Sequence, residues 1–83
     1  MFNHLFGPRD RRAEAGFEKR LLKAAKRMSP VIVGIRSESR NRFGIYVNGD
    51  RVWVVSRYII AQDTAERVVK RLEAEGLEVI PHL

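Results

Sequence analysis

The sequence predicts a small α+β domain in which two helices pack on one mixed sheet of about four strands. Two segments carry apolar residues at helical spacing, and several short runs rich in β-branched residues have the length of strands. Asn48-Gly49 stands between two of those runs and indicates a hairpin. The expected order is α-β-β-β-α-β, and residues 1–83 are expected to form a single domain. Residues 1–9 of this domain are expected to be a flexible N-terminal segment.

The first helix is expected over residues 11–28, with Asp10 as its N-cap and Ser29-Pro30 as its end. Apolar positions on one arc of about 80° are predicted to be buried: Ala13, Phe17, Leu21, Ala24 and Met28. A separate arc of about 120° holds bases without an acid: Lys19, Arg20, Lys23, Lys26 and Arg27. Because charged outer faces are commonly only solvated, this arc is interpreted as either a solvated surface or a binding face.

The first strand is expected over residues 31–35, a continuous apolar run that is typical of a strand buried on both faces. The polar stretch 36–42 is then predicted to be a loop. Its arginines are candidates for contact with a second phosphate strand: Arg36, Arg40 and Arg42.

A hairpin is expected from residues 43–47 and 50–57, because a type I′ turn at Asn48-Gly49 needs positive φ at both positions. Regular pairing from this turn places Trp53 opposite Gly44, on the face that points away from the core.

Tyr46, Arg51 and Trp53 therefore share one predicted face, which is a candidate interaction surface for bases or for a protein. The simpler interpretation is that Trp53 covers Gly44 and that Arg51 lies on Tyr46. The sequence leaves both interpretations open.

The second helix is expected over residues 64–75, with a capping box formed by Asp63 and Glu66. Residues 77–80 predict a closing strand that Pro81 ends. Since this strand follows a helix, it is expected to run parallel to a neighbour through a right-handed crossover.

The first five elements have the same order as double-stranded-RNA-binding domains, which is a likeness of topology alone. Those domains carry a basic cluster at the start of their last helix, where this chain has Asp63-Thr64-Ala65-Glu66. The likeness therefore implies no membership of that family.

Positive charge is concentrated in the first half of the chain. Residues 1–42 contain eleven Lys or Arg and four Asp or Glu, whereas residues 43–83 contain five and six. A polarised field of this kind attracts a polyanion. The chain has no cysteine and no apolar run long enough to span a membrane, so a cytoplasmic protein without disulfides or a membrane span is expected.

No motif predicts catalysis, a metal site or a cofactor. The two histidines, His4 and His82, stand in opposite terminal segments, and no serine lies in a nucleophile motif. The chain is therefore expected not to be an enzyme.

Binding functions remain, and nucleic acid is the first hypothesis, with the five bases of the first helix on phosphates. A small regulator or inhibitor of the kind that mobile elements encode is the alternative. Such a protein would dock on an acidic partner surface or form a homodimer through a sheet edge or the Trp53 face. An anionic membrane surface ranks last, because the apolar stripe of the first helix is needed for the core.

Overall fold

The computed structural model describes residues 11–83, with side chains from residue 16 onward. The elements are α1 Arg11–Ala25, β1 Val31–Ser39, β2 Arg42–Val47, β3 Asp50–Val55, α2 Tyr58–Ala74 and β4 Val79–His82. The predicted order α-β-β-β-α-β and the α+β class are therefore confirmed. Asp10 and residues 1–9 lie outside the described residues, as does the side chain of Ala13.

The four strands form one mixed sheet in the order β3-β2-β1-β4. Strands β1 and β2, and likewise β2 and β3, are antiparallel, whereas β4 runs parallel to β1 at the far edge. The prediction of a parallel closing strand after the second helix is confirmed. This order leaves β3 and β4 as the edge strands of the described sheet.

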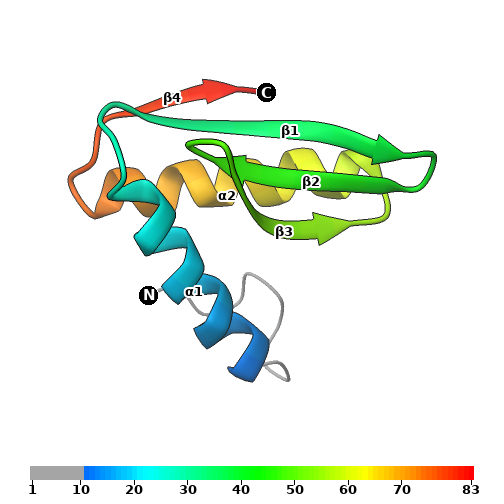
Figure 1. The fold of residues 1–83 in the computed structure, drawn as a ribbon, viewed down its shortest axis with the longest axis horizontal. Coiled ribbons are helices and arrows are strands. Elements are labelled where there is room, and N and C mark those ends of the chain that lie inside the picture. Colours follow the sequence, from blue (N-terminus) through cyan, green and yellow to red (C-terminus); the bar gives the residue numbers. More distant parts are fainter. Residues whose placement is uncertain (1–10) are drawn as a thin grey trace.

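Both helices contribute to one hydrophobic core on a single face of the sheet. Figure 1 shows α2 passing behind β2, while the C-terminal end of α1 lies near the β2–β3 turn. Fully buried side chains from the sheet and from both helices form this core: Phe17, Leu21, Val31, Val33, Ile45, Val47, Val68 and Leu72. The other face of the sheet, which we call the open face, is covered by neither described helix.

Helix α1 ends at Ala25, three residues before the predicted end at Met28. Phe17, Leu21 and Ala24 are buried as predicted. Met28 is 51% exposed, so its predicted burial is wrong. The physical reason lies in the hairpin turn. The Asn48 side-chain amide donates to the Ala24 carbonyl at 2.9 Å and satisfies a carbonyl that a longer helix would have used.

Strand β1 continues to Ser39, so the predicted loop over residues 36–42 is wrong and only residues 40 and 41 form the turn. Arg36 pairs with Gly44, and Ser37 pairs with Phe43. Polar side chains are tolerated along this part of the strand because an antiparallel sheet can face water on one side.

Helix α2 begins at Tyr58 rather than at residue 64, and the predicted capping box is wrong. Asp63 lies inside the helix, where its carboxylate forms an ion pair with Arg67, with Oδ2 3.1 Å from the arginine Nε. The buried stripe of the helix starts earlier, at Ala61, and this burial outweighs the local capping signal. The first turn leaves Ile59 72% exposed.

Strand β4 occupies Val79–His82, so Pro81 lies inside the strand instead of ending it. Within the described part of the chain, no helix has both the length and the apolar character needed to cross a membrane.

Candidate nucleic-acid interface

The predicted basic face of α1 points into solvent. All five bases are exposed: Lys19, Arg20 and Lys23 on the helix, and Lys26 and Arg27 in the turn that follows it. Their exposure follows from the burial of the opposite stripe, which includes Phe17 and Leu21. The two bases beyond Ala25 no longer follow the helical arc, so the face is shorter than predicted.

Arg27 differs from the other four bases because it has an acidic partner. Its Nη1 lies 2.6 Å from Oδ2 of Asp50, at the start of β3. The two side chains are 60% and 41% exposed, so water screens the pair and its contribution to stability is small. Lys19, Arg20, Lys23 and Lys26 form no ion pair with any other residue that the structure describes.

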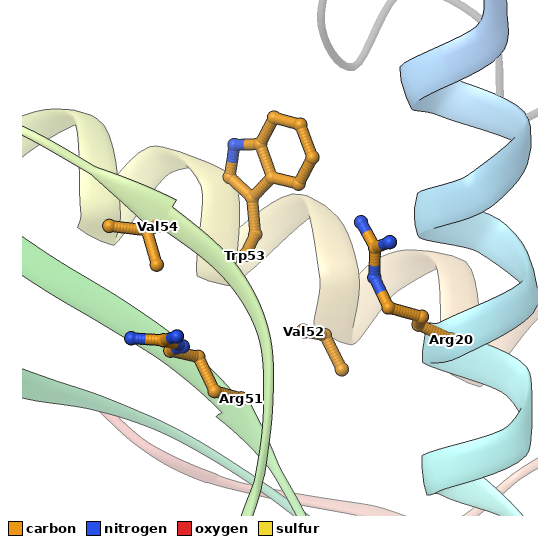
Figure 2. A pocket seen from close by; sticks show the side chains of 5 residues that line it. All are labelled: Arg20, Arg51, Val52, Trp53 and Val54. Atoms are coloured by element: carbon orange, nitrogen blue, oxygen red, sulfur yellow. The ribbon is translucent and has the colours of Figure 1, made fainter.

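A groove lies between α1 and the outer edge of β3. Two adjoining hollows of about 350 and 580 Å³ form it, and Arg20 and Arg51 line both of them. Lys23, Arg27 and the acid Asp50 line the larger hollow, and Trp53 lines the smaller one. Figure 2 shows the Arg20 side chain rising from α1 beside the indole of Trp53. Cations from two separate elements therefore face one groove.

The predicted hairpin register is right only near the turn. Asn48 and Gly49 have φ values of 51° and 87°, and Tyr46 pairs with Arg51 as expected. An irregularity then follows between Ile45 and Tyr46, so that Ile45 pairs with Trp53. The residue that the pairing skips, Val52, is 3% exposed. Regular alternation would also have placed Val52 on the helix-facing side, so the bulge changes the face of the residues that follow it, beginning with Trp53.

Trp53 therefore lies on the helix-facing side of the sheet, and its predicted place beside Tyr46 is wrong. Its ring meets Phe17 of α1 edge to face, with the ring centroids 5.4 Å apart and the planes at 87°. The side chains over Gly44 are instead those of Tyr46 and Glu38. Of the predicted interaction face, Tyr46 and Arg51 remain together and Trp53 belongs to the groove.

The open face carries a network of charged side chains centred on Glu38. The Glu38 carboxylate accepts hydrogen bonds from the Tyr46 hydroxyl and from Nη1 of Arg51, the latter at 2.8 Å. Nε of Arg42 lies 3.4 Å from the same carboxylate. The Arg36 guanidinium lies 4.5 Å from the centroid of the Tyr46 ring, within the range of a cation–π contact. One acid and three arginines thus surround a single aromatic ring.

The hydrogen bond between Tyr46 and Glu38 changes the acidity of both groups. It lowers the pKa of Glu38, and the hydrogen bond from Arg51 adds to this effect while partial burial opposes it. The same bond raises the pKa of Tyr46, with burial acting in the same direction. At neutral pH the network therefore contains a carboxylate and a neutral phenol.

Arg51 belongs to both surfaces. Its guanidinium bonds to Glu38 on the open face, and its side chain lines both hollows of the groove with Arg20. The basic face of α1 and the arginines of the sheet are therefore continuous around the edge formed by β3.

The predicted loop arginines do not act together. Arg36 and Arg42 lie on the open face, whereas Arg40 is exposed in the β1–β2 turn. That turn is at the opposite end of β1 and β2 from the Asn48-Gly49 turn, which contacts the end of α1. Arg40 is thus separated from the helix bases.

The site also contains a residue that the sequence reasoning missed. Glu38 was expected in an exposed loop, but its side chain is only 16% exposed and organises the open face. A signal was present in the alternation of Arg36 and Glu38 with serines, which is typical of a strand with one solvated face. His82 lies on the exposed edge strand β4, and His4 is outside the described residues.

No family model, no curated protein and no solved structure matches this chain. Function must therefore be argued from the geometry of the chain itself.

Proposed function

We propose that this chain is a non-enzymatic module that binds nucleic acid by its phosphates, through the basic face of α1 and the adjoining arginines of the sheet. The observation that supports the proposal best is the position of Arg51. It connects the groove beside Arg20 and Lys23 with the open face, so one band of positive charge continues from the helix onto the sheet. A continuous band is what a nucleic-acid backbone can follow.

The charge balance along α1 agrees with this proposal. Four of the five bases have no ion-pair partner among the described residues. From Lys19 to Lys26 the helical rise gives a span of about 10 Å. About three phosphates of one strand lie within such a span, because each strand of duplex DNA carries one charge per about 3.4 Å of its axis.

The salt dependence of binding tests the proposal quantitatively. With Arg27 held by Asp50, the four remaining bases predict a slope of log K against log salt of about −3.6. Affinity should then fall by about 150-fold between 50 and 200 mM salt. Fluorescence anisotropy of the purified chain with labelled duplex DNA, duplex RNA and single strands measures this slope.

A triple charge reversal tests the location. In the variant Lys19→Glu, Lys23→Glu and Lys26→Glu, binding should be lost while the circular dichroism spectrum and the melting temperature are kept. A matched variant with the same change in net charge, Arg57→Glu, Arg67→Glu and Lys70→Glu on and before α2, should lose far less affinity. If both variants lose the same affinity, binding depends on the net charge of the chain and the helix is not the specific contact surface. Absence of any binding by the wild-type chain at 50 mM salt would end the proposal.

A protein partner is the second candidate, and the edge position of β3 favours it. An extended acidic peptide could add to β3 as a further strand, with its carboxylates beside Arg20 and Arg51 in the groove. Main-chain hydrogen bonds are less sensitive to salt than phosphate contacts. A partner captured from extract that stays bound at 300 mM salt, together with no nucleic-acid binding, would favour this candidate.

A further inference from the structure

The open face has a shallow hollow over Gly34, in the middle of β1. Gly34 pairs with Tyr46 on one side and with His82 on the other, and all three positions alternate with helix-facing ones. The hollow measures about 150 Å³, and Tyr46, Ile32 and Arg36 line it together with Gly34. The Tyr46 ring therefore lines a hollow over a position that has no side chain.

The fold does not require a glycine at position 34. A Cβ built there would lie 3.6 Å from the His82 carbonyl oxygen and 3.9 Å from the His82 Cβ, which are ordinary contacts. Its φ is not positive, in contrast to Gly49 and Gly76. A glycine inside a strand weakens the strand, and such glycines often mark the close approach of a ligand.

Gly44 on the neighbouring strand shows what a structurally required glycine looks like. A Cβ there would lie 2.6 Å from Cε1 of Tyr46 and 2.8 Å from Oε2 of Glu38. Packing thus explains Gly44 completely, and it leaves Gly34 without a structural explanation.

The walls of the hollow are held in place and are positively charged. Tyr46 is fixed by its hydrogen bond to Glu38, and the Arg36 guanidinium lies over its ring. Arg36, Arg42 and Arg51 exceed the single acid, Glu38, so the open face attracts anions.

We infer that the hollow over Gly34 holds one unpaired base of a single-stranded nucleic acid, stacked beside Tyr46 and Arg36, with neighbouring phosphates on Arg42 and Arg51. This inference rests on the proposed function and names its ligand class. A base inside a duplex is paired and stacked on both sides, so it cannot lie flat in a hollow of the sheet. Sequence-tolerant stacking on an aromatic ring in a basic surface is the common way of holding single strands.

Filling the hollow without harming the fold tests the inference. The variants are Gly34→Val and the smaller Gly34→Ala, and the matched control is Ser37→Val, which adds similar bulk to the other face of β1. Anisotropy is measured with labelled 12-nucleotide single strands of DNA and of RNA and with a hairpin duplex, alongside thermal unfolding. Gly34→Val should lower single-strand affinity by about 5-fold to 100-fold, the range that one stacked base contributes. Duplex affinity and the affinity of the control should stay within about twofold of wild type.

The outcomes separate this inference from the proposed function. If Gly34→Val folds and binds single strands as tightly as wild type does, the base site in the hollow is overturned. The proposed function still stands in that case, provided that the wild-type chain binds nucleic acid. An equal loss on duplex and single strand would also overturn the base site. If Gly34→Val does not fold, Gly34→Ala decides the question, because its Cβ makes only ordinary contacts and should still lower single-strand affinity. A wild-type chain that binds no nucleic acid would remove both proposals. The DNA and RNA arms show which sugar the site prefers.

Discussion

The Tyr46 hydroxyl donates a hydrogen bond to the Glu38 carboxylate across β1 and β2, directly above a residue without a side chain, Gly44. This contact orients the Tyr46 ring on the open face, and the same carboxylate lies between Arg42 and Arg51. Because the ring and the carboxylate both lie over bare backbone, a Cβ added at position 44 and removal of the Glu38 charge each disturb this contact.

Replacing Gly44 by alanine should destabilise the fold. The new Cβ would lie within 3 Å of both Tyr46 and Glu38, so their hydrogen bond must shift or break. Overpacking of this kind costs about 1–3 kcal/mol. Urea unfolding measures the cost, and Gly34→Ala on the next strand is the matched control, with no loss of stability expected. Two variants of equal stability would contradict this account of Gly44.

The stability contributed by Glu38 should depend on pH on the acid side. The pKa of Glu38 is lower in the folded chain than its ordinary value of 4.5, chiefly because of the hydrogen bond from Tyr46. The contribution is therefore complete above that ordinary value and is lost as the pH falls through the lowered pKa. The difference in free energy of unfolding between wild type and Glu38→Gln should be largest near pH 6–7 and shrink toward pH 3. A constant difference over this range would show that the carboxylate charge plays no part.

Replacing Asn48 by glycine should weaken the connection between the hairpin and α1. Glycine keeps the positive φ of the turn but loses the side-chain bonds to the Ala24 carbonyl and the Ile32 amide, both at 2.9 Å. Partly buried groups would be left without partners, at a cost of about 1–3 kcal/mol. The matched control is Asn41→Gly in the other exposed turn, which should change stability by less than about 0.5 kcal/mol. Equal midpoints for the two variants in urea would refute the capping role of Asn48.

Local signals were sufficient for much of the fold. Asn48-Gly49 predicted the turn correctly, and the apolar spacing of Phe17, Leu21 and Ala24 predicted the buried stripe of α1. The limits of the elements depended on contacts between distant residues. Helix α1 is ended by an amide from residue 48, and α2 starts early because Ala61 is buried against the sheet. Neither contact leaves a signal within the helix sequence itself.

The candidate site was predicted as two sets of residues, and the structure divides them differently. The helix bases are exposed as expected, but Arg36 and Arg42 join Tyr46 and Arg51 on the open face instead of a loop. A bulge one residue long moved Trp53 to the opposite side of the sheet. There its ring meets Phe17 of α1, a contact between distant residues that alternation along the strand cannot reveal.

Pro81 disfavours the addition of another strand at the β4 edge of the sheet. The Val31 amide donates to the Glu78 carbonyl, and backbone groups alternate in direction along a strand, so the nitrogen of Pro81 points outward from β4. Proline has no hydrogen to donate there, so this edge is a poor template for another strand. Among the edges of the described sheet, β3 is then the one open to strand addition. Copies that met through β3 would form a closed two-fold pair and could not continue into a fibre.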